Sequence, residues 1–118
     1  MLQKHLDLRD RTKQFALRVL KLCDSLPKTD AARVMSRQLL RSATSVAANY
    51  RAVGRARSRA EFIAKMGVVI EEADESVFWL ELLVDSGNVP KTRLDDLIAE
   101  ANELVSIFVA SQETARGK

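Results

Sequence analysis

Apolar residues recur along this chain at alternating spacings of three and four, which is typical of one face of an α-helix. The first run covers about residues 6–26 and ends at Pro27, because the residue before a proline is pushed out of the helical region. The second run begins near Thr29 or Asp30, either of which can cap a helix, and Gly54 interrupts it. Two long helices are therefore predicted in the first half of the chain.

The second half contains two further helical runs with clear start and stop signals. Ser58 and Glu61 have the spacing of a capping box, and an apolar run follows at once. Gly87 and Asn88 are typical of a C-terminal cap, and Pro90 lies just before or inside the next helix. Four helices joined by short links predict an all-α protein, an antiparallel up-down-up-down four-helix bundle. We expect a single domain over residues 1–118, a length that is short for two domains.

The face that the second helix is predicted to bury contains two polar residues. This seam comprises Ala32, Met35, Leu39, Ser42, Val46, Asn49 and Val53. A buried asparagine must find hydrogen-bond partners, so it fixes register or oligomeric state at some cost in stability. Ser42 and Asn49 either are satisfied locally and serve packing, or specify a particular assembly, and both interpretations stay open.

The composition agrees with a helical protein and excludes several kinds of site. Only 5% of the residues are aromatic, with 4 Gly and 2 Pro, which disfavours an all-β domain. The single cysteine, Cys23, excludes an internal disulfide and is predicted to be a small core residue, and the single histidine, His5, leaves little for a metal centre. No apolar stretch is long enough to span a membrane, and the N-terminus is too charged for a signal peptide, so we expect a cytoplasmic protein without a membrane partner.

Charge is distributed unevenly behind the net value of +3. Residues 1–59 contain 14 Lys and Arg against 4 Asp and Glu, which gives +10, whereas residues 60–118 contain 5 against 12, which gives −7. A chain divided in this way can pair with itself, within or between subunits. It can also offer a basic face to a polyanion.

Arginines dominate the predicted outer face of the second helix. At about 100° per residue, they share one arc on the side away from the seam, and Arg55 joins them if the helix runs through Gly54. Lys13, Arg18 and Lys21 add positive charge on the first helix. The predicted nucleic-acid-binding residues are Arg33, Arg37, Arg41, Arg51 and Arg55, with Arg57 and Arg59 extending the charge into the following turn.

A row of guanidinium groups can follow a nucleic-acid backbone, because each planar fork donates two parallel hydrogen bonds to phosphate. Tyr50 is the only nearby aromatic residue, so binding would read backbone and shape more than sequence. Two alternatives stay open. The face can be merely solvated, or it can pair with the acidic third helix, which contains Glu71, Glu72, Asp74, Glu75 and Glu81.

No catalytic or metal site is predicted. Bundles with di-metal centres use Glu-x-x-His on their helices, and no glutamate here has a histidine three residues later. Glu72, Asp74 and Glu75 are therefore interpreted as salt-bridge partners. Neither a phosphate-binding glycine loop nor a histidine near Ser42 or Ser45 is present, so we expect no enzymatic activity and no cofactor.

Three motifs resemble one bacterial family. They are RSATSVAANYR at residues 41–51, RARSRAEFIAK at 55–65 and EADESVFWLELL at 72–83. In order and at fitting separations, they resemble the four helix bundle protein family, also called the 23S rRNA intervening-sequence protein family and often labelled S23 ribosomal protein. Arg41, Asn49 and Arg51 match its pattern, whereas Ala52 stands where relatives often have a glutamate, so a salt bridge made there by relatives is not expected here.

The resemblance implies a non-enzymatic role. Some members of the family are encoded within intervening sequences of bacterial 23S rRNA genes. A relative, the accessory variability determinant of diversity-generating retroelements, forms a homopentamer and binds both nucleic acid and a reverse transcriptase. The partners implied are therefore nucleic acid, further copies of the chain in a pentamer, and a reverse transcriptase. The residues expected to serve structure or assembly are Ser42, Asn49, Tyr50, Glu72 and Glu75.

Overall fold

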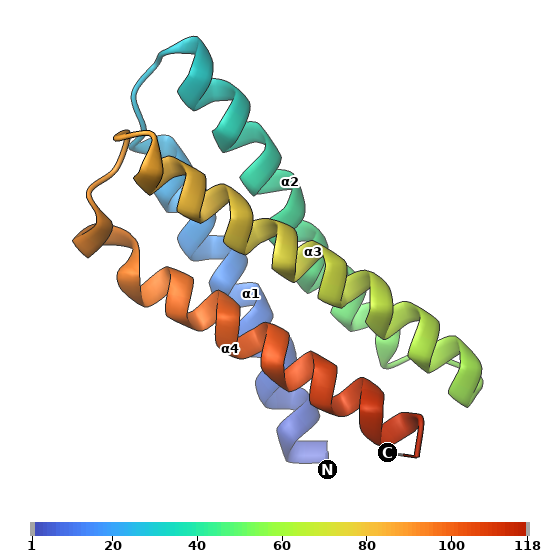
Figure 1. Cartoon of the computed structure of the whole chain (residues 1–118). Coiled ribbons are helices and arrows are strands. Elements are labelled where there is room, and N and C mark those ends of the chain that lie inside the picture. Colours follow the sequence, from blue (N-terminus) through green and yellow to red (C-terminus); the bar gives the residue numbers. More distant parts are fainter. Residues whose placement is uncertain (1, 118) are drawn as a thin grey trace.

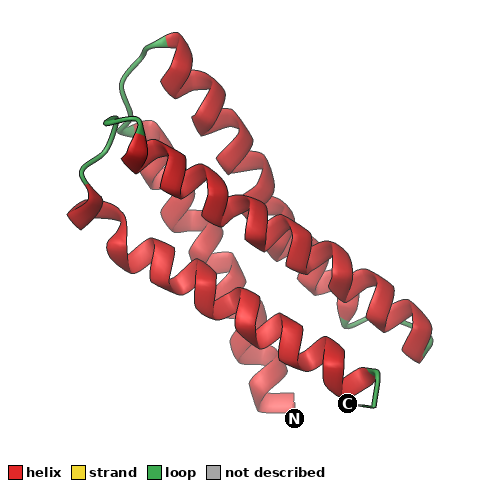
Figure 2. Cartoon of the chain, in the orientation of Figure 1, coloured by secondary structure: helices red, strands yellow, loops and turns green. Residues whose placement is uncertain are grey.

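Four antiparallel helices form the protein in this computed structural model, which describes residues 2–117, with side chains from residue 7 onward (Figure 1). They are α1 (Leu2–Asp24), α2 (Asp30–Val53), α3 (Arg59–Asp85) and α4 (Lys91–Ala115). The bundle measures 45 × 22 × 22 Å, and short loops connect its helices (Figure 2). The prediction of an all-α, up-down-up-down bundle is confirmed. The side chain of His5 lies outside the described part of the chain.

The helices begin and end at residues that satisfy backbone groups. Thr29 caps α2 by accepting a hydrogen bond from the Ala32 amide, and Ser58 caps α3 by accepting one from the Glu61 amide. After α3, Gly87 adopts a φ of +79°, which favours glycine because a side chain would be strained there. Pro90 directly precedes α4, where its missing amide hydrogen costs nothing.

One apolar core runs the length of the bundle and receives side chains from all four helices. Phe15, Leu39, Leu80, Leu104 and Phe108 are among the large side chains that are fully buried. The predicted seam of α2 is correct except at one position. Asn49 is only half-buried, and Tyr50 takes the core position, where its ring stacks on Phe108 at a centroid distance of 5.5 Å.

The helices are joined pairwise by polar contacts as well as by the core. Between α2 and α3, the fully buried hydroxyls of Ser42 and Ser76 lie 3.0 Å apart, and the Ser42 hydroxyl also donates to the carbonyl of Leu39. Between α1 and α4, Arg11 forms an ion pair with Glu100 at 2.7 Å. Ser42 is thus satisfied inside the chain, as the local interpretation of this residue required.

Candidate nucleic-acid interface

The arginines predicted to bind nucleic acid are all exposed. Four of them, Arg33, Arg37, Arg41 and Arg51, lie on α2. The condition for extending this arc to Arg55 along the helix is not met, because α2 ends at Val53 and Gly54 caps it. Arg55 and Arg57 instead belong to the loop between α2 and α3, and Arg59 is the first residue of α3. The basic surface therefore turns from a helix face into the loop at one end of the bundle.

Arg41 differs from the other arginines because it is held by two carboxylates. Its guanidinium lies 3.2 Å from Glu72 and also forms an ion pair with Glu75, so it bridges α2 and α3. The negative charge of Glu72 is the main reason that the pKa of Arg41 is raised. Pairing with the acidic third helix, one of the alternatives for this face, thus occurs within the chain at Arg41.

Glu72 lies in an environment that disfavours its charged form. Burial raises its pKa first, and a hydrogen bond with Glu75 raises it further, while the attraction of Arg41 acts in the opposite direction. The net shift is upward, so desolvation and the neighbouring acid outweigh the one arginine. The cluster thus has two carboxylates for one cation and leaves no surplus positive charge for an anion.

The remaining arginines have weak pairs or none. Arg33 lies 3.4 Å from Asp30, and Arg57 lies 4.0 Å from Glu61, both at sites where such pairs contribute little. Within residues 7–117, no carboxylate lies within ion-pair distance of Arg37, Arg51, Arg55 or Arg59. These last four guanidinium groups can donate to an external anion without first breaking a contact.

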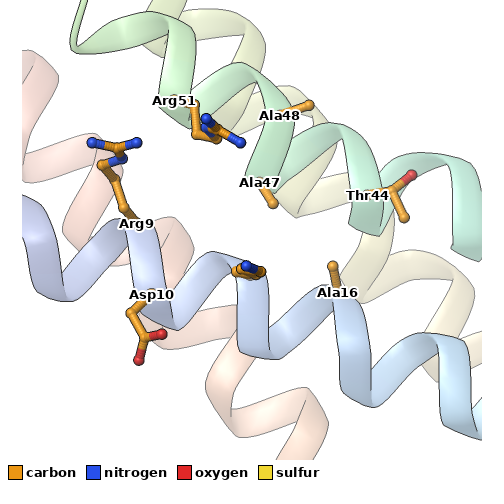
Figure 3. Close-up of a pocket in the computed structure, with 8 residues that line it drawn as sticks. Arg9, Asp10, Ala16, Thr44, Ala47, Ala48 and Arg51 are labelled. Carbon is orange, nitrogen blue, oxygen red and sulfur yellow. The ribbon is translucent and has the colours of Figure 1, made fainter.

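A groove between α1 and α2 brings further cations to this face. Its volume is about 680 Å³, and its lining includes Arg9 and Lys13 from α1 together with Arg51 from α2. Figure 3 shows Arg9 and Arg51 reaching into the space between the two helices, whereas Asp10 extends away from it. Arg9 is not among the arginines that the sequence singles out. Only the antiparallel pairing of α1 with α2 places it opposite Arg51.

The candidate residues for assembly lie in two different environments. Ser42 is buried in the contact of α2 with α3, and Tyr50 is buried in the core, where desolvation raises the pKa of its hydroxyl. Tyr50 is therefore not exposed for stacking on a base. Asn49 is half-buried at the edge of the bundle, with no hydrogen bond from its side chain in the part of the chain described.

The single cysteine is held in an unreactive setting. Cys23 is half-buried, its thiol donates to the carbonyl of Ser36 at 3.6 Å, and burial raises its pKa, which keeps it protonated. Among the described residues, no three His, Cys, Asp or Glu side chains are grouped as they would be to hold a metal ion. None of the described helices is long and apolar enough to cross a membrane.

Comparison with known proteins identifies relatives of this chain. A family model described as 23S rRNA-intervening sequence protein matches residues 4–110. The structure is similar to that of a protein with unknown function from the S23 ribosomal protein family of Bacteroides thetaiotaomicron, with a TM-score of 0.86 and 32% sequence identity. That likeness covers 93% of this chain and 98% of the other. No curated protein matches the chain.

Proposed function

This chain belongs to the 23S rRNA-intervening sequence protein family, and we propose that it is a non-enzymatic protein that binds the phosphate backbone of nucleic acid. The binding surface consists of the exposed arginines of α2 and of the loop that follows it. The observation that carries the proposal is that Arg37, Arg51, Arg55 and Arg59 are exposed and have no carboxylate partner within the described chain. Unpaired guanidinium groups in a row provide the charge and geometry that phosphates require.

The proposed contact reads the backbone and not the bases. Recognition of unpaired bases uses exposed aromatic rings, and Tyr50, the aromatic residue nearest this surface, is buried against Phe108. The exposed ring of Phe78 lies on α3, between Val77 and Trp79, where the nearby charges of Asp74 and Glu81 repel phosphate. Affinity should consequently depend strongly on salt and weakly on sequence.

The protein is further proposed to act as a homo-oligomer. Phe78 and Val68 are 53% and 45% exposed on α3, although this helix also has a complete core face. A helix with apolar residues on all sides is typically buried on all sides. Leu17 and Leu20 are exposed on α1, beside the basic residues Arg18 and Lys21.

Charge complementarity favours contact between α1 of one copy and α3 of the next. Such a contact uses two different surfaces, and repeated contacts of this kind form a ring when the rotation between successive copies closes. Five subunits, the number implied by the family resemblance, is the number proposed. A reverse transcriptase remains a predicted partner on the resemblance alone.

The test is binding of labelled RNA and DNA by fluorescence polarisation at about 50 and 200 mM salt. The double variant Arg37→Glu with Arg55→Glu reverses two unpaired arginines outside the groove. Its control, Lys91→Glu with Arg93→Glu, makes the same change of charge at the start of α4, outside the arginine face of α2. We expect the first variant to lose at least about tenfold in affinity at the lower salt, and the control to lose about twofold or less.

Two results would contradict nucleic-acid binding through this surface. One is the absence of any binding by the wild-type protein at low salt. The other is equal loss in the two double variants, which would mean that only net charge matters. Light scattering tests the assembly separately, and a monomer at micromolar concentration would contradict it.

A second candidate function is a protein-interaction scaffold, and the bridge from Arg41 to Glu72 and Glu75 favours it. This bridge shows that an arginine of α2 can be neutralised by the acidic residues of α3. If neighbouring subunits or a partner protein neutralise the other arginines in the same way, reversal of Arg37 and Arg55 will lower the particle mass and leave nucleic-acid binding unchanged.

A further inference from the structure

The groove between α1 and α2 has a cationic rim and a floor of small residues. Arg9, Lys13 and Arg51 supply the cations, and the floor consists of Ala16, Ala47, Ala48 and Thr44. The Thr44 hydroxyl donates to the Leu40 carbonyl at 2.7 Å, so that its hydrogen is already engaged. The floor is thus short and largely apolar, and about 680 Å³ of space lies above it.

The charges of this groove are unbalanced. Arg9 and Arg51 extend into the same space from opposite helices (Figure 3). Asp10 also belongs to the lining, but its carboxylate extends away from this space, so that one acid stands against three cations. Of the carboxylates in the described chain, none lies within ion-pair distance of Arg9, Lys13 or Arg51. Like charges that face each other without a counter-charge are unfavourable, and an anion placed between them removes the repulsion.

We propose that this groove seats a phosphate of the nucleic-acid backbone between Arg9 and Arg51, with Lys13 beside it. The inference rests on the proposed function and locates its strongest contact. The floor of three alanines and Thr44 allows the adjoining sugar to approach the helices closely, because none of these side chains extends beyond its γ position. Arg51 belongs to both the groove and the arginine face of α2, so a strand seated here continues along that face.

The shape of the groove favours a phosphodiester chain over an acidic helix of a second copy. A helix with its side chains is about 10–12 Å across, which is as wide as the helices that form the groove. The carboxylates of such a helix would reach the cations at the rim of the groove, and the residues of the floor would have no contact with it. A phosphodiester chain is narrower, and it carries a full charge at each link.

The experiment compares groove variants with matched controls by fluorescence polarisation, using labelled oligouridine and a duplex RNA of equal length. Arg9→Ala with Arg51→Ala removes two charges from the groove, and Lys91→Ala with Arg93→Ala removes two elsewhere. Ala48→Leu fills the floor without a change of charge, and Ala31→Leu makes the same substitution at an exposed site of α2 outside the groove. Thermal melting by circular dichroism verifies that each variant is folded.

We expect Arg9→Ala with Arg51→Ala to weaken binding at least about tenfold and to lower the salt slope by about two, with at least one of the probes. Ala48→Leu should weaken binding several-fold, and both controls should stay within about twofold of the wild type. The groove proposal is overturned, and the proposed function stands, if the groove variants match their controls while Arg37→Glu with Arg55→Glu still reduces binding. It is also overturned if the groove variants change the particle mass and not the affinity. If the wild-type protein binds neither probe at low salt, the proposed function itself fails.

Discussion

α2 and α3 pack against each other, yet they divide their surfaces in opposite ways. α2 separates its apolar and charged residues sharply, with Leu39 and Val46 in the core and unpaired arginines outside. α3 mixes them, because Val68 and Phe78 lie on its outer side among Glu71, Asp74 and Glu81. Apart from Val34, the large apolar residues of α2 lie in the core or pack against it, whereas α3 leaves both Val68 and Phe78 exposed. We infer that α2 presents charge outward and α3 presents surface for assembly.

The largest effect on the fold is expected from the inner face of α2. Leu39 is fully buried, and Leu39→Ala should lower the free energy of unfolding by about 2–5 kcal/mol, because it removes packed methyl groups and leaves a cavity. Val34 lies on the same helix and is 59% exposed, so that Val34→Ala should change stability by less than about 0.5 kcal/mol. Urea unfolding measures the change in stability of both variants. Equal losses would contradict the division of α2 into an inner apolar face and an outer charged face.

The contact of α2 with α3 should tolerate little added volume. Ser42 is fully buried against Ser76, and Ser42→Leu should cost about 1–3 kcal/mol by forcing the helices apart. Ser42→Ala removes the hydroxyl without adding volume and should cost about 1 kcal/mol or less. Urea unfolding of the two variants distinguishes close packing from hydrogen bonding. A larger loss of stability in Ser42→Ala than in Ser42→Leu would show that the hydrogen bonds of this serine matter more than its small volume.

The outer face of α3 should affect assembly more than folding. Phe78→Asp loses one edge contact with Trp79, at a centroid distance of 4.9 Å, so the chain should lose only about 1 kcal/mol in stability. The same substitution places a charge in the apolar part of the proposed interface, and light scattering should show a smaller particle. An unchanged particle mass would indicate that the exposed apolar residues of α3 do not form an interface between subunits.

The smallest effect is expected at the acidic cluster between the two helices, and it depends on pH. The pKa of Glu72 is raised by burial, so the folded chain binds this proton more tightly than the unfolded chain does. The contribution of Glu72 to stability therefore improves as the pH falls from neutral through the raised pKa, and it stops changing below the ordinary carboxyl range. Glu72→Gln should lose this dependence without being less stable at neutral pH.

Urea unfolding of wild type and Glu72→Gln across this pH range measures the difference between them. Acidification affects other carboxyl groups equally in both proteins, so only the difference reports on Glu72. A variant that is markedly less stable at neutral pH would show that the pair with Arg41 outweighs the burial of the carboxylate.

The helices could be predicted closely from the sequence because their ends are encoded locally. Thr29, Ser58, Gly87 and Pro90 each act on the backbone within a few residues, so that no knowledge of tertiary contacts is needed. The error at Asn49 has a geometric cause. Residues that are seven positions apart do not lie directly above one another on a straight helix, because each repeat moves them by about 20° around the helix axis. After nearly three repeats from Ala32, the core position has moved from Asn49 to Tyr50.

The candidate site was less accessible to prediction because it depends on how neighbouring helices are rotated and aligned. Helical periodicity placed Arg41 on the outer face of α2, but it could not show that Glu72 and Glu75 lie within reach. For the same reason, Arg9 gained significance only when α1 was placed antiparallel to α2. The sequence of each helix determines which of its residues lie on one face. The assembled bundle determines which residues of different helices lie close together.

The up-down-up-down order brings the first turn of α1 and the last turn of α4 to the same end of the rod, where the loop bearing Arg55 and Arg57 also lies (Figure 1). A short peptide can therefore join these two ends, and the chain can be reopened between α1 and α2 to give a circular permutant with the same four helices. An affinity tag on either terminus would lie at the same end of the bundle as the arginine loop. Tags should be cleaved before any measurement of binding to polyanions.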